Sequence, residues 1–285
     1  METKISSESK ETIISPEGPT TLIGERINPT GKKKLAAALQ AGDWDLVRRV
    51  ACSQVEAGAD ILDLNVGMAG LDEVAILPQA VQSVMDVVDV PLSLDSSNPK
   101  ALEAAMKVYR GKPLINSVTG EKRSLEAILP LVREYGAAVI GLTLDDEGIP
   151  NDADRRVGIA YKIVEQAEHL DIPCNDIIID CLTLTVGSDY KAGQTTIETV
   201  RKVKEKLGVN LALGCSNISF GLPDRDLLNS IFLAIAIAAG VNCPIVDVAK
   251  MRPVVLAVDL AMGRDQYAMR YIKGYRARQQ QAQST

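Results

Sequence analysis

The sequence of 285 residues predicts a TIM (β/α)8 barrel. Eight short apolar runs bounded by turn residues recur along the chain, and segments with helical periodicity separate them. Continuous apolar runs are typical of parallel strands that are covered on both faces. Eight such strands in about 250 residues match the usual count and length of this fold. The expected strands span residues 21–27, 60–65, 91–94, 113–116, 138–143, 176–180, 211–214 and 244–247.

The main alternative fold is an open, doubly wound sheet. That fold requires a turn of the form G-x-G-x-x-G after its first strand. The segment Gly24-Glu25-Arg26-Ile27-Asn28, which contains the end of the first expected strand, lacks this pattern. Residues 125–132 and 197–203 show the apolar spacing of helices between strands, and no linker divides the chain. One barrel is therefore favoured.

The expected barrel covers residues 20–273 as one domain. Residues 1–19 are rich in Ser, Glu, Lys and Thr, so they are predicted to form a flexible N-terminal arm. Residues 274–285 are rich in Gln and are predicted to form a polar C-terminal tail.

Charge and cysteine content exclude several classes of function. A net charge of -6 argues against nucleic-acid binding, and the only basic run, Lys32-Lys33-Lys34, is expected on a solvated helix start. Five dispersed cysteines and a single His169 predict no metal site and reduced thiols. With no signal peptide and no apolar run long enough to cross a bilayer, we expect a soluble cytoplasmic protein.

Four polar residues follow expected strands: Asp95, Asn116, Asp180 and Asn217. The carboxyl ends of barrel strands form the ligand-binding face, so these side chains are predicted to share one pocket. Two carboxylates and two amides suit a flat neutral heterocycle that has both donors and acceptors, such as a pterin. The alternative is that each residue caps a helix or forms a turn, as the following Ser96-Ser97-Asn98-Pro99 allows for Asp95.

Six segments carry a resemblance to a known family. They are Gly24–Asn28, Leu62–Gly67, Leu94–Ser96, Ile115–Ser117, Ile140–Thr143 and Leu213–Asn217. In this order and spacing, the sequence resembles the pterin-binding corrinoid-dependent methyltransferases, which include the folate domain of cobalamin-dependent methionine synthase. The resemblance implies a pterin-binding type of TIM barrel and a homodimer. It also implies transfer of a methyl group between N5 of tetrahydrofolate and the cobalt of a corrinoid (cobalamin), in either direction.

The resemblance also implies functions for individual residues. Asp95, Asn116 and Asp180 are expected to hold the edge of the pterin ring, and Asn217 is expected to face N5 as the catalytic residue. The further residues expected to bind tetrahydrofolate or 5-methyltetrahydrofolate are Ser216 and Arg225, with Glu25, Asn28, Asp63 and Asn65 as possible additions. The sequence departs from the family at Cys181 and Phe220, where a relative has Pro and Gln.

Two other functions would use a similar pocket. Dihydropteroate synthases carry an Arg-Lys pair after the serine of the seventh strand, whereas here Asn217 and Ile218 follow Ser216. Without those cations the departure of diphosphate lacks electrostatic stabilisation. A non-catalytic module that binds folate or a corrinoid protein would use the same residues and stays open.

The corrinoid is expected on a partner protein, because the sequence has no D-x-H-x-x-G run to supply an axial histidine. Cys215 is interpreted as a packed thiol rather than a nucleophile. The apolar run Ile231–Ile235 could pack on the barrel wall or on a partner subunit, and the wall is the simpler expectation.

Overall fold

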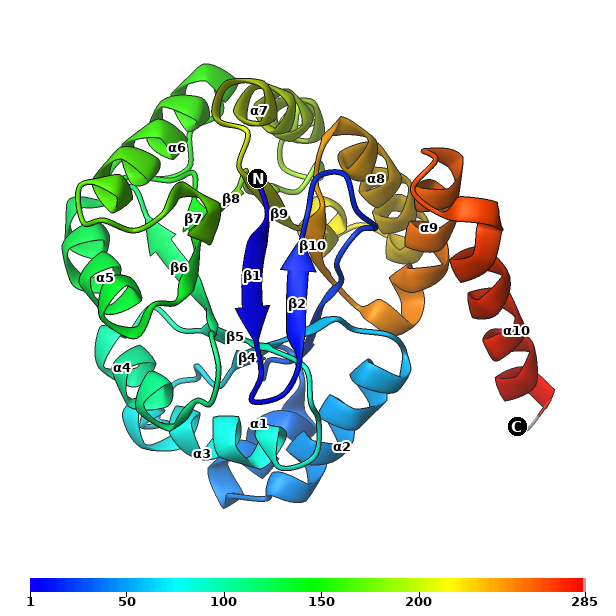
Figure 1. Ribbon diagram of the computed structural model, residues 1–285, viewed down its shortest axis with the longest axis horizontal. Coiled ribbons are helices and arrows are strands. Elements are labelled where there is room, and N and C mark those ends of the chain that lie inside the picture. Colours follow the sequence, from blue (N-terminus) through cyan, green and yellow to red (C-terminus); the bar gives the residue numbers. More distant parts are fainter. Residues whose placement is uncertain (284–285) are drawn as a thin grey trace.

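The computed structural model describes residues 1–283 and contains a closed barrel of eight parallel strands (Figure 1). The strand order is β10-β3-β4-β5-β6-β7-β8-β9, and β10 pairs with both β3 and β9, which closes the barrel. This confirms the predicted fold. The strands are β3 (Ile23–Ile27), β4 (Ile61–Asn65), β5 (Leu92–Asp95), β6 (Leu114–Thr119), β7 (Ala138–Leu142), β8 (Ile177–Asp180), β9 (Asn210–Gly214) and β10 (Cys243–Val246).

Helices surround the barrel and cover the outer face of the strands (Figure 1). Helix α5 shows the cause, because its apolar residues at helical spacing, from Leu125 to Val132, are the ones it buries. Among residues 1–283, no helix is both long and apolar enough to cross a bilayer. The surrounding helices are α1 (Lys33–Ala41), α2 (Trp44–Glu56), α3 (Glu73–Met85), α4 (Pro99–Val108), α5 (Lys122–Tyr135), α6 (Ala153–Glu168), α7 (Ala192–Leu207), α8 (Arg225–Ala239) and α9 (Val248–Ala261).

The expectation of a flexible arm over residues 1–19 is wrong for its first part. Strands β1 (Thr3–Ser6) and β2 (Glu11–Ile14) form an antiparallel hairpin that lies across the end of the barrel in Figure 1. Ile5 and Ile14 are buried, and Asn210 Nδ2 donates to Thr3 Oγ1 and to the Ile14 carbonyl. The two isoleucines pack with the interior residues Ile23, Ile61, Leu114, Ala138, Ile140, Ile178, Ala212 and Cys243. The hairpin therefore closes the amino-terminal end of the barrel.

The predicted polar C-terminal tail is helical. Helix α10 spans Met269–Gln283 and is drawn in red in Figure 1. It packs closely on α9, because a Cβ on Gly274 would lie 2.5 Å from Leu256 Cδ1. The part of the predicted tail at residues 284–285 lies outside the described residues.

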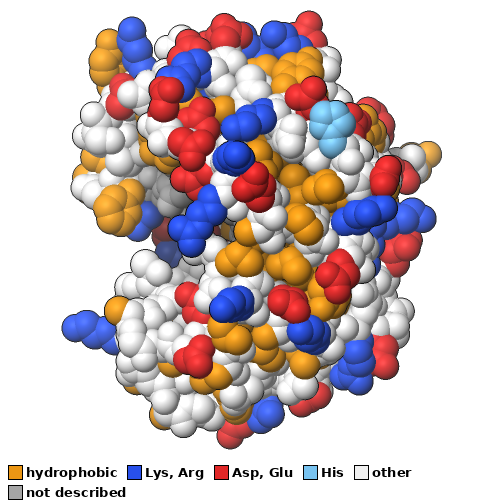
Figure 2. All heavy atoms as spheres, turned by 90° about the vertical axis from the view of Figure 1, so that its left-hand side faces the viewer, with side chains coloured by type: hydrophobic (Ala, Val, Ile, Leu, Met, Phe, Trp, Pro, Cys, Tyr) orange, Lys and Arg blue, Asp and Glu red, His pale blue; other side chains and the backbone are white. Residues whose placement is uncertain are grey.

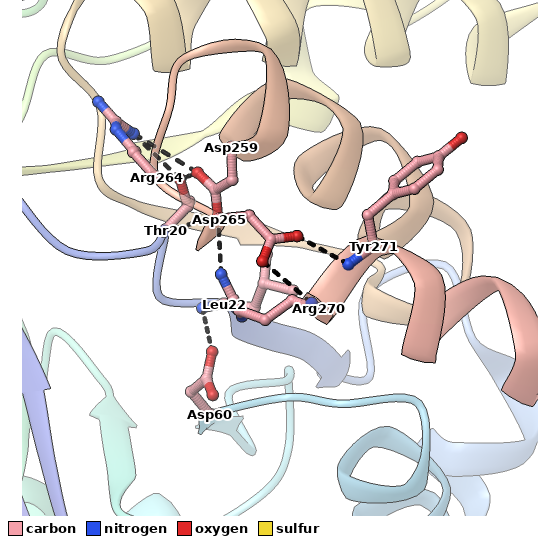
Figure 3. A network of polar contacts seen from close by, with 8 residues as sticks. All are labelled: Thr20, Leu22, Asp60, Asp259, Arg264, Asp265, Arg270 and Tyr271. Atoms are coloured by element: carbon pink, nitrogen blue, oxygen red, sulfur yellow. Dashed lines mark hydrogen bonds and ion pairs between the residues drawn. The ribbon is translucent and has the colours of Figure 1, made fainter. Parts of the chain in front are cut away.

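A buried aspartate connects both ends of the chain (Figure 3). Asp259 accepts hydrogen bonds from the backbone N–H and hydroxyl of Thr20, at 3.0 and 2.7 Å. It also pairs with Arg270 at 3.0 Å and with Arg264 at 3.6 Å. Asp265 accepts from backbone N–H groups in the first turn of α10. These contacts hold the start of α10 against the segment that leads into β3.

The interior of the barrel changes from apolar to polar along each strand. Every second residue of a strand points to the same face. On β4 the inward position changes from Ile61, in the apolar layer, to the buried Asp63. On β8 it changes from Ile178 to Asp180. The polar positions lie at the carboxyl ends, away from the hairpin, and they form the site described next.

Candidate functional site

Asp63 is the centre of a buried polar group that joins three neighbouring strands. Its Oδ1 accepts a hydrogen bond from Ser93 Oγ at 2.7 Å and from Asn116 Nδ2 at 3.0 Å. The register places Asp63 beside Ser93, and β5 beside β6. The parallel barrel therefore brings Ser93 and Asn116, which are 30 and 53 positions from Asp63 in the sequence, into direct contact with it.

Asp95 lies next to this group at the end of β5. Asn65 Nδ2 donates to Asp95 Oδ2 at 2.9 Å, and Asp95 also hydrogen-bonds with Asp63. Burial raises the pKa of Asp95 well above its usual range, and the adjacent charge of Asp63 raises it further. Burial also raises the pKa of Asp63, against the hydrogen bonds from Asn116 and Ser93. Two such close carboxyl groups cannot both ionise at low cost.

Asp180 occupies the end of β8, across the mouth from that pair. Its carboxylate accepts from the backbone N–H of Leu182 at 2.7 Å and of Gly214 at 3.3 Å. Burial raises its pKa to about 6, although these hydrogen bonds and the charge of Arg156 oppose the shift. The fully buried Arg156 donates hydrogen bonds to the carbonyl groups of Pro150, Cys181 and Leu182. These bonds fix the segment that follows β8.

Asn217 lies in the 3-10 turn η2 (Cys215–Ser219) that follows β9. Its side chain is exposed and folds back over the strand end, since a Cβ on Gly214 would lie 3.4 Å from Asn217 Nδ2. No hydrogen bond of this amide to another described residue is found. The amide is thus available to a ligand, beside the strand end that donates to Asp180.

Glu25 connects the two halves of the rim. Ser216 Oγ donates to Glu25 Oε2 at 3.3 Å, and this contact links residues 191 positions apart. Burial raises the pKa of Glu25. Its charge also acts on Asp63, so the carboxylate lies between the Asp63 group and the turn at Ser216. Asn28 stays apart, because its side chain accepts from the Thr30 N–H in a local turn.

Arg225 is fixed by the turn before α8. Its Nε donates to Ser219 Oγ and its Nη2 to the Ser216 carbonyl, both at 2.9 Å. Its guanidinium also lies 6.0 Å from the ring centroid of Phe220, which is 69% exposed. Cys181 is fully buried. Of the two departures from the family pattern, only Phe220 is thus exposed at the mouth.

A cavity of about 580 Å³ opens beside Glu25 and Ser216, a size typical of ligand sites. Figure 2 shows the molecule from the side, hollowed on the side away from the hairpin, with acidic and basic side chains around the hollow. Among the residues predicted from sequence, Glu25, Ser216 and Arg225 line this cavity. The other charged residues in its wall are Arg26, Lys32, Asp224, Asp226, Asp247 and Lys250.

Several of these residues were not found from sequence. Ser93 could have been found, because a serine between Leu92 and Leu94 in a buried strand marks an inward polar position. Lys32 was expected on a solvated helix start, yet it is half-buried in the cavity wall, whereas Lys33 is exposed. No feature of the sequence distinguishes the two lysines.

The cysteines take no part in this site as thiolates. All five are free, and Cys181, Cys215 and Cys243 are buried. Burial raises the pKa of the Cys215 thiol well above its usual value, which agrees with a packed thiol. Within residues 1–283, no group of three or more His, Cys, Asp or Glu side chains is arranged to hold a metal ion.

Comparison with known families agrees with this geometry. The profile of the pterin binding enzymes matches residues 24–247, which span the barrel from β3 to the end of β10. The chain belongs to the pterin-binding enzyme family. The polar strand ends described above all lie within the matched region.

Relatives in this family include methyltransferases. The chain is 30% identical over 265 residues to a methylcorrinoid:tetrahydrofolate methyltransferase of Eubacterium limosum, covering 90% of this chain and 96% of that protein. It is 34% identical over 245 residues to methionine synthase of Mycobacterium tuberculosis, covering 81% of this chain and 21% of that much longer protein. The chain is thus related over nearly its full length to a methyltransferase named for a methylcorrinoid and tetrahydrofolate.

Solved structures of dihydropteroate synthases share the fold. The enzyme of Yersinia pestis in complex with a pterine-sulfa conjugate superposes with a TM-score of 0.71 at 16% identity, covering 92% of this chain and 99% of that one. The enzyme of Xanthomonas albilineans with 7,8-dihydropteroate has a TM-score of 0.64 at 19% identity, covering 88% and 95%. At these identities the likeness concerns the barrel alone.

Proposed function

We propose that this protein transfers a methyl group between N5 of tetrahydrofolate and the cobalt of a separate corrinoid protein. The observation that carries the proposal is the match over 96% of a methylcorrinoid:tetrahydrofolate methyltransferase. The name of that relative favours transfer from the methylated corrinoid to tetrahydrofolate. The polar mouth of the barrel has the chemistry that such a substrate needs.

The carboxyl groups at the mouth suit the edge of a pterin ring. The ring presents N3–H and the 2-amino group side by side, and one carboxylate can accept from both donors. Burial disfavours the ionised forms of Asp95 and Asp180 in the free protein. Two ring donors would stabilise the ionised form. Asn116, which already donates to Asp63, retains an amide oxygen that can accept from a ring N–H.

Asn217 is proposed to face N5. The corrinoid supplies a methyl–cobalt bond that breaks with both electrons remaining on cobalt. In this direction the lone pair of N5 forms the new bond to carbon, and N5 then gives up its proton. The Asn217 oxygen can accept a hydrogen bond from N5–H, and this bond becomes stronger as positive charge develops on nitrogen. In the reverse direction, the same amide stabilises the protonated amine as leaving group.

A synthase reaction with a diphosphate leaving group is less well supported. The cavity beside Ser216 is lined by four basic and four acidic side chains, with Glu25 counted among the acidic ones. Its charges are therefore nearly balanced, whereas a departing diphosphate needs an excess of cations. Ile218, at the position where synthases carry a cation, is buried.

A homodimer is also proposed. Ile231 and Ile235 of α8 are 51% and 46% exposed, whereas Phe232 and Leu233 of the same run are buried. The two exposed isoleucines, together with Ile197 and Phe232, line an apolar groove between α7 and α8. Light scattering tests this proposal. A mass of twice the 30.6 kDa of the chain supports it, and a mass of one chain contradicts it.

The test of the activity is spectroscopic. The protein is mixed without oxygen with a methylated corrinoid protein and tetrahydrofolate, and the absorbance band of cobalt(I) is followed. Appearance of the band together with 5-methyltetrahydrofolate supports the proposal. Pterin binding without any spectral change would instead indicate a binding module, and condensation of a pterin diphosphate with p-aminobenzoate would indicate a synthase.

A further inference from the structure

Lys32 is a half-buried cation at the cavity beside Ser216. It caps the start of α1, and its side chain lines the cavity, whereas Lys33 and Lys34 are exposed. Lys32 Nζ donates to the carbonyl of Arg26 at 3.1 Å and to that of Glu25 at 3.4 Å. Burial lowers the pKa of Lys32. In residues 1–283, no carboxylate lies within ion-pair distance of its ammonium group.

The other cations of this cavity are more fully engaged. Arg26 pairs with Asp247 at 3.5 Å, and Lys250 pairs with Asp226 at 2.8 Å. Arg225 donates from two of its nitrogens to the turn η2 and keeps Nη1 for another partner. Lys32 and this last nitrogen are therefore the donors that a bound anion can use. One ammonium and one guanidinium nitrogen can pair with a single carboxylate.

The chemistry of tetrahydrofolate indicates which carboxylate arrives there. Its aminobenzoyl-glutamate chain is attached to C6, the ring carbon bonded to N5. If N5 faces Asn217, the chain must leave the pterin close to Ser216 and Arg225. The cavity of about 580 Å³ that these two residues line is the adjoining space.

We propose that Lys32, with Arg225, binds a carboxylate of the glutamate tail of tetrahydrofolate. This inference rests on the proposed function, because it requires the pterin ring to lie over the polar strand ends. Lys32 would then distinguish folates from pterins that lack the glutamate. The charges of Glu25 and Asp247 favour the ammonium form of Lys32, but among the described residues neither carboxylate forms an ion pair with it, so a bound carboxylate can pair with the ammonium directly.

The test compares tetrahydrofolate with tetrahydropteroate, which lacks the glutamate and ends in the benzoate carboxylate. Binding of tetrahydrofolate and of tetrahydropteroate is measured by anaerobic titration calorimetry with the wild type, Lys32→Met and Lys33→Met. Methionine keeps the length of the side chain and removes its charge. We expect Lys32→Met to weaken tetrahydrofolate binding about 10-fold, since a hydrogen bond to a charged group is lost, and to leave tetrahydropteroate binding unchanged. Lys33→Met, at the exposed first residue of α1, should change neither.

Each other result contradicts the inference. If Lys32→Met lowered the affinity for both ligands equally, Lys32 would support the local structure or the pterin site and would not bind the glutamate. Equal affinity of the wild type for both ligands would show that the glutamate is not bound. A wild type that binds neither ligand would contradict the proposed function itself. Circular dichroism of the variants checks that they are folded.

Discussion

The two ends of the barrel interior differ in chemistry although the same strands form both. At the amino-terminal end, Ile61 and Ile178 meet the hairpin residues Ile5 and Ile14 in a closed apolar layer. Two residues further along these strands, the inward positions carry Asp63 and Asp180, whose carboxyl groups are buried just below the mouth. One end thus stabilises the fold and the other holds groups whose burial is unfavourable for their charge.

This difference indicates how stability and function are divided. Apolar burial at the hairpin end favours folding. The raised pKa values of Asp95 and Asp180 show that ionisation of the mouth residues opposes folding. Substitutions at the hairpin end should therefore lower stability and leave ligand affinity unchanged. Substitutions at the mouth should change ligand binding or reaction rate, and some of them should stabilise the protein.

The largest expected effect is on stability, at the hairpin. Ile14→Ala removes a fully buried side chain and should lower the free energy of unfolding by about 2–5 kcal/mol. Ile13→Ala, on the opposite face of the same strand and 45% exposed, is the matched control and should have little effect. Denaturant unfolding measures both. A matching loss of tetrahydrofolate affinity in folded Ile14→Ala would show that the two ends are not separate.

The second effect is on rate, at the mouth. Asn217→Ala should lower the rate of methyl transfer on the order of 10²-fold, because one hydrogen bond positioned at the reacting nitrogen is lost. The affinity for tetrahydrofolate should change much less, and the unfolding curve should stay the same, since the side chain is exposed. Single-turnover kinetics together with ligand titration separate these quantities. An unchanged rate would remove Asn217 from catalysis.

The smallest effect concerns pH and stability at Asp180. Its pKa is raised to about 6 in the folded protein, so the stability that its protonated form contributes is complete below about 4 and is lost as pH rises through 6. Asp180→Asn keeps the side chain neutral. It should raise the free energy of unfolding by about 1–3 kcal/mol at pH 8 and give no advantage at pH 4.

The same variant should bind tetrahydrofolate more weakly, which would sharpen the contrast with the hairpin. The exposed Asp146→Asn serves as control for the pH series. Thermal unfolding across pH 4–8 and ligand titration provide the measurements. A destabilised Asp180→Asn at pH 8 would mean that the hydrogen bonds from Leu182 and Gly214 outweigh the burial of charge.

The barrel was predictable because its strands are continuous apolar runs. The expected strand at 176–180, for example, is observed at Ile177–Asp180. The hairpin was not predictable, because its strands have four residues each and present only Ile5 and Ile14 as large buried side chains. So short a pattern does not differ from that of a solvated segment. Helix α10 was missed for a similar reason, since its anchor is the buried Asp259 on another helix.

The sequence by itself determined the fold class and the residues that end its strands, because both follow from local apolar runs and from the parallel geometry that aligns their carboxyl ends. Only the tertiary structure decided which of these groups touch. The contact of Ser216 with Glu25 joins strands β3 and β9 that are far apart in the chain. Lys32 points into the cavity because its ammonium group donates to the Arg26 carbonyl, and both the cavity and this contact form only when the barrel is folded. Burial and charge pairing are properties of the packed molecule, and they decide which polar residues are available to a ligand.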